Sequence, residues 1–151
     1  MTLGYIRGKS FPLAIEWCDG VWMACDCAVA WKEIRDAAAK DGVKLIPSSG
    51  WRSFEEQKAL WTERSDPDVR AIKGPAAKPG YSNHQSGRAV DIRGCPGVKQ
   101  LSDGHSTPVY DWLKTNAKRF GFQRTVTVEA WHWEISVPRE DRITKSEQNK
   151  T

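Results

Sequence analysis

The stretch Ser82–Asp91 constrains this chain more than any other. It reads S-N-H-Q-S-G-R-A-V-D, so His84 and Asp91 lie seven positions apart with Gly87 between them. A glycine permits a tight turn that a residue with a Cβ atom resists. Residues 89–92 alternate like a short strand, which predicts that Asp91 points to one face of a sheet. An imidazole and a carboxylate are suitable ligands for Zn²⁺, but a site needs a third ligand.

The best candidate for that third ligand is His132, far along the chain in V-E-A-W-H-W-E. His132, Glu134 and Ser136 alternate with apolar residues, a pattern typical of a strand that shows His132 on its polar face. The apolar residues, which are expected to be buried, are Trp131, Trp133, Ile135 and Val137. Glu129 precedes His132 by three positions, so a turn or bulge near Ala130 is needed to bring the two together. A glutamate beside a three-ligand zinc is suited to act as general base for an activated water.

These two stretches resemble the zinc D-Ala-D-Ala metallopeptidases, which are carboxypeptidases of the VanY type in the lysostaphin/D-Ala-D-Ala/hedgehog fold group. The family pattern S-x-H-x-x-G-x-A-x-D is filled at every fixed position, by Ser82, His84, Gly87, Ala89 and Asp91. The family pattern E-x-W-H is filled by Glu129, Trp131 and His132. The combination is far more specific than either motif alone.

Two further blocks extend the resemblance. S-G-W-R-S at residues 49–53, together with Gln57, resembles the family's S-G-Y-R-S…Q, although Trp51 stands where the family often has tyrosine. Residues 111–122 resemble its W-L…N-A…Y-G-F block. The similarity therefore runs from about Ala28 to Val137.

The resemblance implies a zinc peptidase that acts on D-amino-acid-containing peptides of peptidoglycan. It implies three zinc ligands: His84, Asp91 and His132. It also implies that Glu129 is the general base and that Arg52 contacts the substrate carbonyl or the developing oxyanion. Substrate contacts are implied for Ser82 and Gln57, and Trp131 is expected in the wall of the substrate pocket or in the core.

Each of these residues also has a structural interpretation. Ser82 could cap a loop, Gln57 could lie on a helix surface, and Arg52 could pair with a surface acid. Glu134 is a metal ligand by residue type, but we place it beside the ligands or on the strand surface. The histidine in the Ser/Asp/Gly-rich segment, His105, serves as a control and is expected on the surface.

The position of the cut is left open between three alternatives of the same fold. We favour a D-alanyl-D-alanine carboxypeptidase, and the alternatives are a D,D-dipeptidase and an endolysin-like peptidoglycan endopeptidase. A non-catalytic zinc-containing binding module is a rival from another class, since hedgehog domains share the fold group. Glu129 and Arg52 argue against it, because a purely structural zinc requires neither.

Length and charge limit the other classes of function. The 151 residues predict one domain over 1–138, with a polar, charged tail over 139–151. The net charge of +4 is modest and no stretch gathers basic with aromatic residues, so we expect no nucleic-acid partner. No apolar run is long enough for a membrane helix. We also expect the protein to be a monomer.

The cellular location is not determined by these residues. The first ten residues lack the apolar segment of a signal peptide, so the sequence is either a mature form or one delivered by other means, such as a phage-type lysin. The expected substrate places its action at the cell wall. The four cysteines are interpreted as small buried side chains, with one disulfide possible outside the cytosol: Cys18, Cys25, Cys27 and Cys95.

The predicted fold class is α+β, with a small antiparallel sheet that carries the zinc site and about three flanking helices. Asp26 is expected to cap a helix over 27–40, with a buried stripe formed by Val29, Trp31, Ile34 and Ala38. A capping box at 53–56 opens a helix to about Arg64, and Thr107-Pro108 opens another to Phe120.

The remaining segments are predicted as strands and loops. Residues 1–24 are expected to form a hairpin that turns at Asp19-Gly20. Short strands are expected over 43–46 and 122–128, and long loops over 62–81 and 94–106.

Overall fold

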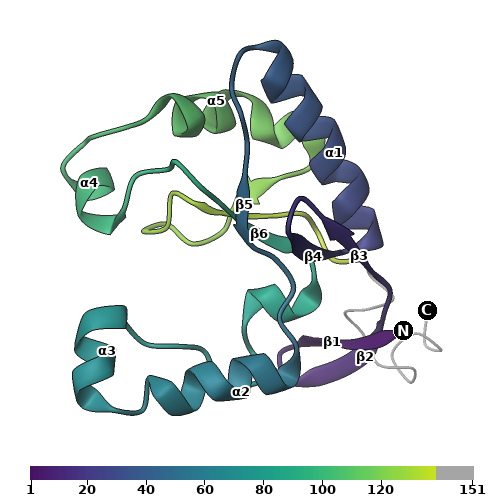
Figure 1. Ribbon diagram of the computed structural model, residues 1–151, viewed down its shortest axis with the longest axis vertical. Coiled ribbons are helices and arrows are strands. Elements are labelled where there is room, and N and C mark those ends of the chain that lie inside the picture. The colour runs from purple at the N-terminus through teal and green to yellow at the C-terminus, as the bar shows by residue number, and fades with distance from the viewer. Residues whose placement is uncertain (139–151) are drawn as a thin grey trace, which may run out of the picture.

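The computed structural model describes residues 1–138, so the predicted polar tail lies outside the described residues. The predicted α+β class is confirmed. A four-stranded antiparallel sheet has the strand order β5-β6-β8-β7, and two separate two-stranded hairpins precede it in the chain. The helices flank these sheets (Figure 1).

The four-stranded sheet brings the two sequence motifs side by side. Its strands are β5 (Pro47–Ser49), β6 (Ala89–Ile92), β8 (His132–Glu134) and β7 (Gln123–Arg124). In the register of β6 with β8, Asp91 lies directly opposite His132. Partners across antiparallel strands project on the same face, so this one register joins residues 41 positions apart.

The predicted hairpin at Asp19-Gly20 is present. It joins β3 (Ile15–Cys18) to β4 (Val21–Ala24), and both turn residues have positive φ, 51° and 94°. Asp19 also accepts a hydrogen bond from the buried Trp31 Nε1 at 2.7 Å, which attaches the hairpin to the helix that follows.

A second hairpin precedes it and was not predicted. It pairs β1 (Thr2–Ile6) with β2 (Lys9–Leu13) through a turn at Arg7 and Gly8. Arg7 has φ +50°, a left-handed conformation in which arginine is uncommon. The dipeptide lacks the Asn or Asp that usually marks such a turn, which explains why the pattern was missed.

The long helix α1 (Cys25–Lys40) begins two residues earlier than predicted. Ala24 is its N-cap, and Asp26 lies in the first turn instead of at the cap. The prediction that Val29 belongs to the buried stripe is wrong, because Val29 is 58% exposed. At 100° per residue Val29 lies on the face opposite Trp31, and the buried face is formed by Cys27, Ala28, Trp31, Ile34 and Ala38.

The two other predicted helices are confirmed together with their caps. Helix α2 (Phe54–Glu63) starts at the expected capping box, in which Ser53 Oγ accepts from the Glu56 amide at 3.0 Å. Helix α5 (Pro108–Asn116) is capped by Thr107 and continues as a 3₁₀ turn over 117–120.

Both segments predicted as long loops contain a short helix. These are α3 (Pro67–Lys73) and α4 (Val98–Ser102), so the described residues hold five helices instead of about three. The first segment is rich in proline, but Pro67 occupies the first turn of α3, where a helix needs no amide hydrogen. Within residues 1–138 no helix is both long enough and apolar enough to cross a membrane.

Two predicted strands differ from those observed. Residues 43–46 form no strand, and β5 begins at Pro47, where the chain lies opposite Ile92. The strand predicted over 122–128 is limited to β7, because the chain turns away after Arg124.

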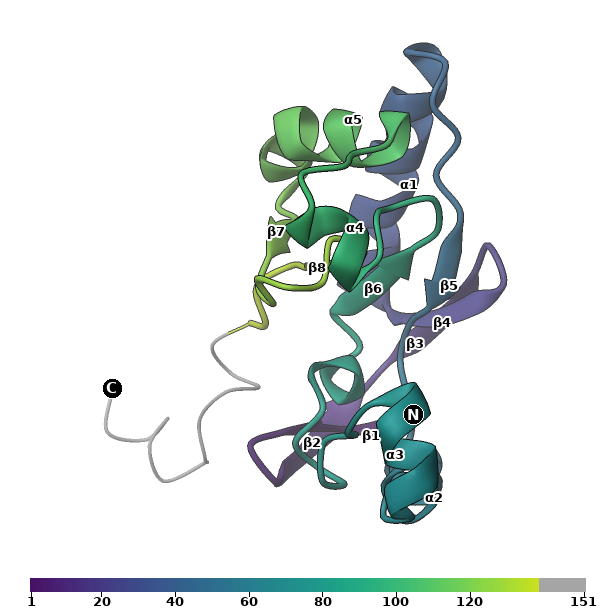
Figure 2. The same cartoon turned by 90° about the vertical axis from the view of Figure 1, so that its left-hand side faces the viewer.

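Most of the helices lie at two ends of the sheet. Figures 1 and 2 show α1 and α5 together at one end, and α2 and α3 with the β1–β2 hairpin at the other. The core lies between α1, α5 and the sheet, and its largest fully buried side chains include Trp31, Met23, Ile34, Leu113 and Phe122.

All four cysteines are free. Cys18 and Cys27 are buried as predicted, and burial raises the pKa of Cys27 to about 12. Cys25 is exposed and Cys95 is half-buried, so the prediction of small buried side chains holds for two of the four.

Candidate active site

The Ser82–Asp91 motif folds as a 3₁₀ turn followed by strand β6. The turn η1 (Asn83–Ser86) is capped by Ser82, whose hydroxyl accepts from the His84 amide at 3.3 Å. Arg88 is buried, and its Nε donates to Asp26 in α1 at 3.0 Å. The motif is thereby attached to the long helix as well as to the sheet.

Gly87 makes the turn between the two ligand positions possible. Its φ is +76°, and a Cβ added there would lie 3.0 Å from the Ala24 Cβ and 3.1 Å from the Ala24 amide nitrogen. The Gly87 carbonyl accepts from that amide at 2.9 Å. Both the conformation and the close approach to β4 therefore require glycine, as the sequence pattern indicated.

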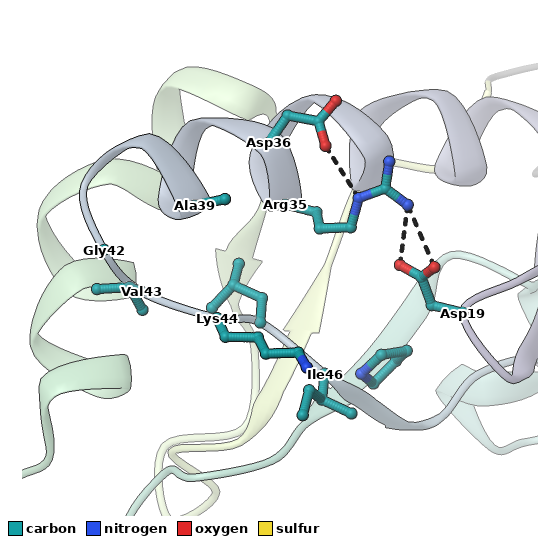
Figure 3. Close-up of a pocket in the computed structure, with 10 residues that line it drawn as sticks. Asp19, Arg35, Asp36, Ala39, Gly42, Val43, Lys44 and Ile46 are labelled. Atoms are coloured by element: carbon teal, nitrogen blue, oxygen red, sulfur yellow. Dashed lines mark hydrogen bonds and ion pairs between the residues drawn. The ribbon is translucent and has the colours of Figure 1, made fainter.

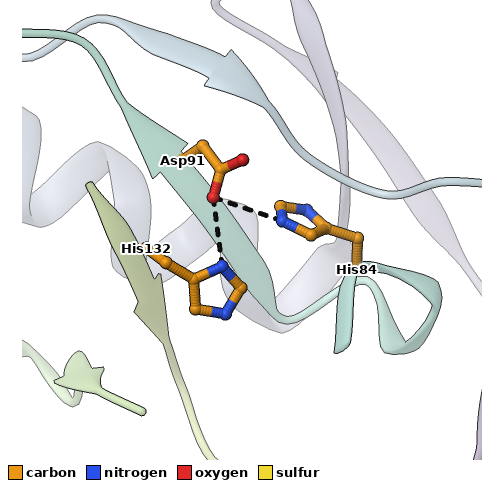
Figure 4. Close-up of side chains that lie close together, drawn as sticks. All are labelled: His84, Asp91 and His132. Carbon is orange, nitrogen blue, oxygen red and sulfur yellow. Dashed lines mark hydrogen bonds and ion pairs between the residues drawn. The ribbon is translucent and has the colours of Figure 1, made fainter. Parts of the chain in front are cut away.

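The three predicted metal ligands meet at one point (Figure 4). Asp91 Oδ1 lies 3.2 Å from His84 Nε2 and 3.1 Å from His132 Nδ1. One ligand atom from each residue lies within 4.8 Å of the others. Both imidazoles are buried and the carboxylate is largely so, which is an arrangement that could hold a metal ion.

The other nitrogen of each imidazole is already engaged. His84 Nδ1 donates to the Gly50 carbonyl at 2.8 Å, and His132 Nε2 donates to Glu134 Oε2 at 2.8 Å. These partners fix the ring orientations and direct His84 Nε2 and His132 Nδ1 towards Asp91. This is the usual role of the groups that surround metal-binding histidines.

Glu134 is the centre of a small polar network behind His132. Its Oε2 accepts from Asn83 Nδ2 at 3.0 Å and from the Thr125 hydroxyl, in addition to the histidine. Our sequence interpretation placed Glu134 beside the ligands or on the strand surface, and the contact with His132 puts it beside a ligand. Asn83 and Thr125 were missed. Asn83 stands at a variable position of the family pattern, and Thr125 belongs to no motif.

The electrostatics of the three-residue cluster favour a positive charge at its centre. Burial by itself raises the pKa of Asp91, but hydrogen bonds from His132 and His84 and their charge hold it well below its usual range. Burial lowers the pKa of His132, while its hydrogen bonds to Asp91 and Glu134 dominate and raise the pKa to about 9. A metal cation at this point would take the place of that proton.

Glu129 lies at the edge of the same cluster. Its backbone forms the turn expected near Ala130, with the His132 amide donating to the Glu129 carbonyl at 3.4 Å. Glu129 Oε1 lies 3.8 Å from His132 Nδ1. The turn therefore brings to one side two residues that a regular strand would separate.

Arg52 is held against the motif by its backbone and its side chain. Its amide donates to the His84 carbonyl at 3.2 Å, and its Nη2 donates to Ser49 Oγ at 3.2 Å. Burial lowers the pKa of Arg52, and the charge of Asp91 acts in the opposite direction. Arginine stays protonated in proteins, so this side chain is a half-buried cation beside the cluster.

All eight residues assigned to the site from sequence line one cavity of about 830 Å³. They are Arg52, Gln57, Ser82, His84, Asp91, Glu129, Trp131 and His132. Trp131 is half-buried and contributes to the cavity wall. The control histidine, His105, is exposed and does not line the cavity.

Gln57 is buried, so its interpretation as a helix-surface residue is wrong. Its Nε2 donates to the Ala77 carbonyl at 2.8 Å, and its Oε1 accepts from Arg52 Nη1 at 3.5 Å. It therefore attaches the segment after α3 to α2 and supports Arg52. A direct substrate contact by Gln57 stays a prediction.

A separate cavity of about 670 Å³ lies between α1 and residues 42–47 (Figure 3). None of the predicted site residues lines it. Two of its acids are engaged by one arginine, since Arg35 binds Asp36 at 3.0 Å and Asp19 at 3.1 Å. Lys44 is the other charged side chain in the lining.

Comparison with known proteins places the chain in a family. Residues 20–137 match the model of the VanY family, described as D-alanyl-D-alanine carboxypeptidase. The chain belongs to this family. The matched residues contain every predicted site residue, and the predicted resemblance to VanY-type proteins is confirmed.

Curated relatives and solved structures agree with VanY membership. A putative carboxypeptidase, YodJ of Bacillus subtilis, is 37% identical over 99 residues. A D-alanyl-D-alanine carboxypeptidase of Enterococcus faecalis is 35% identical over 125 residues. These matches cover 64% and 68% of this chain, but only 36% and 44% of the relatives, so the chain spans less than half of their length.

Two solved structures resemble almost the whole chain. A mutant of the vancomycin resistance D,D-pentapeptidase VanY, in complex with Zn(II), has a TM-score of 0.66 and 29% identity, with 93% of this chain and 88% of that chain covered. VanYB in complex with D-Alanine-D-Alanine has a TM-score of 0.65 and 30% identity, with 90% and 86% covered.

Proposed function

We propose that this protein is a zinc-dependent D-alanyl-D-alanine carboxypeptidase that acts on stem peptides of peptidoglycan. The observation that carries the proposal is that the His84, Asp91 and His132 side chains converge beside Glu129 and Arg52 in one cavity. The VanY membership and the relatives' names support the same activity.

The donor set fits zinc. Two imidazole nitrogens and one carboxylate oxygen are ligands that zinc prefers, and three protein ligands leave one position open, as in catalytic zinc sites. His84 Nε2, Asp91 Oδ1 and His132 Nδ1 would hold the ion. When bound, zinc supplies a Lewis acid and makes a nucleophilic water available near neutral pH.

The remaining steps fall to Glu129 and Arg52. Glu129 accepts the proton of the attacking water and then delivers it to the leaving amine. Arg52 donates hydrogen bonds to the oxygen of the scissile carbonyl as negative charge develops on it. Ser82, Gln57 and Trp131 are proposed to contact or enclose the peptide, since all three line the cavity.

The proposed substrate places the action of the protein at the cell wall, outside the cytoplasm. We also propose that a single chain is sufficient for activity. Every group assigned to the site comes from this chain, and the cavity that contains them is lined by its own residues.

The activity is tested by incubating the zinc-loaded protein with purified muropeptides and identifying the products by mass spectrometry. Loss of one terminal D-Ala is the expected result. Release of a dipeptide would indicate a dipeptidase, and cleavage of a cross-link would indicate an endopeptidase. Unchanged muropeptides together with bound zinc would support the non-catalytic binding module.

Replacement of Arg52 by alanine is expected to lower kcat and kcat/KM together by about 10²–10³, the usual effect of removing one oxyanion donor. Arg52→Lys should rescue only in part, because lysine keeps the charge but loses the planar fork. Arg93→Ala, which removes an exposed arginine, is the control. If kcat, measured at saturating substrate, is unchanged while KM is raised, Arg52 contributes to substrate binding alone.

Replacement of Glu134 by alanine is expected to weaken zinc binding about 10- to 100-fold, the usual effect of losing a partner of a metal-binding histidine. The reason is that His132 Nε2 loses its hydrogen-bond acceptor, so the orientation of the imidazole ring is no longer fixed. Competition with a chromogenic chelator measures the affinity without using activity. Glu55→Ala, on an exposed position of α2, should bind zinc like the wild type. Wild-type affinity in Glu134→Ala would show that the network does not support the site.

A further inference from the structure

Arg64 is a cation in the active-site cavity that no motif identified. It follows the last turn of α2 as its C-cap residue and lines the cavity together with Arg52. Its Nε atom is buried and has no hydrogen-bond partner. Its Nη1 has one long contact, 3.5 Å to the Pro75 carbonyl. A guanidinium has five N–H donors, so most of its capacity to bind an acceptor is unused.

Arg64 also lacks a carboxylate partner within the described residues. The neighbouring acid, Glu63, forms its ion pair with Lys73 at 2.5 Å, and no ion pair of Arg64 occurs within residues 1–138. Burial is the main cause that lowers the pKa of Arg52, and the charge of the nearby Arg64 lowers it further. Two cations that share a partly buried cavity are unfavourable unless an anion is bound between or beside them.

We propose that Arg64 binds a carboxylate of the substrate peptide through the two terminal nitrogens of its guanidinium. The inference rests on the proposed function and adds to it a substrate feature, an anionic group held at the α2–α3 side of the cavity. A guanidinium edge matches a carboxylate in a two-bond geometry, which adds specificity as well as affinity. The carboxylate can be the C-terminal one or one carried by the stem of the peptide.

The alternative is a structural role for Arg64. In that role its contact with the Pro75 carbonyl would only fasten the segment after α3 to α2. Such a role predicts that Arg64 variants lose stability, or affinity for every peptide to the same extent. A carboxylate site predicts that the loss depends on one particular carboxylate.

Calorimetric binding to zinc-loaded Glu129→Gln protein distinguishes the two roles without hydrolysis. Three forms of a stem pentapeptide ending in D-Ala-D-Ala are compared: one with free carboxylates, one with a C-terminal amide and one with its internal carboxylate amidated. We expect one of the two amides to bind about 10- to 100-fold more weakly, the range for a charge-assisted hydrogen bond. Adding Arg64→Gln should abolish that difference, and the identity of the amide shows which carboxylate is bound.

Arg70→Gln is the matched control, because Arg70 lies on α3 but does not line the active-site cavity. It should keep the full difference between the peptides. Arg64→Lys should restore part of the affinity, since it keeps the charge, and thermal melting of each variant shows whether it folds.

The outcomes separate this inference from the proposed function. If Arg64→Gln lowers the affinity for all three peptides equally, or lowers none of them, the carboxylate site is overturned. The absence of peptide binding to any form of the protein would overturn it too. Hydrolysis of the free peptide by protein with intact Glu129 is measured separately. If that hydrolysis fails while binding depends on Arg64 and one carboxylate, only the proposed carboxypeptidase activity is rejected.

Discussion

Replacement of Glu129 by glutamine is expected to lower the rate of peptide hydrolysis by roughly 10²–10⁴, the range for removal of a general base. Glutamine has nearly the same shape but cannot take up the proton of the attacking water. Glu129 Oε1 lies 3.8 Å from His132 Nδ1, at the edge of the cluster and not within it. The variant should therefore bind zinc like the wild type.

Zinc content and steady-state kinetics on the same sample test this expectation. Glu55→Gln, which changes an exposed glutamate of α2, is the control for the loss of one negative charge. A Glu129→Gln protein that hydrolyses its substrate at the wild-type rate would assign the base elsewhere. Glu134 would be the next candidate, because it contacts His132 from the other side. A variant that loses zinc would instead make Glu129 part of the metal site.

Replacement of His132 by alanine is expected to remove most of the bound zinc and nearly all activity. Within residues 1–138, three side chains bring a ligand atom to this point, and a site with two keeps little affinity for the ion. The same result is expected for His84→Ala and Asp91→Ala. Metal content is measured by mass spectrometry after gel filtration, with activity measured on the same fractions.

His105→Ala is the control for the ligand variants, because His105 is exposed and outside the cavity. Its zinc content and activity should equal those of the wild type. Removal of zinc from the wild type with a chelator should abolish activity, and added zinc should restore it. Full zinc occupancy in His132→Ala would refute this ligand set.

The ligand types and the local turns could be predicted because they depend on neighbouring residues. Gly87 was recognisable because only glycine readily adopts φ +76° at a turn packed against β4. The capping box at Ser53 and Glu56 spans three positions and gave the correct start of α2. The turn at Glu129 was predicted for a similar reason, since strand alternation alone would have separated it from His132.

Elements whose conformation depends on distant contacts were predicted poorly. Helix α3 was missed because the segment that contains it is rich in proline, although Pro67 lies where a helix tolerates it. The strand predicted over 43–46 starts at Pro47, because pairing with β6 sets its position. Val29 was assigned to the buried face of α1, but which face is buried depends on the elements packed against it.

The candidate ligands and the glycine between two of them could be predicted from the sequence, because they are local features. The groups that surround them follow from tertiary packing. Asn83 meets Glu134 across 51 positions, and the Gly50 carbonyl meets His84 across 34. Arg64 enters the cavity from the end of α2. No periodicity or spacing marks these contacts, because they arise from the packing of separate elements around the sheet.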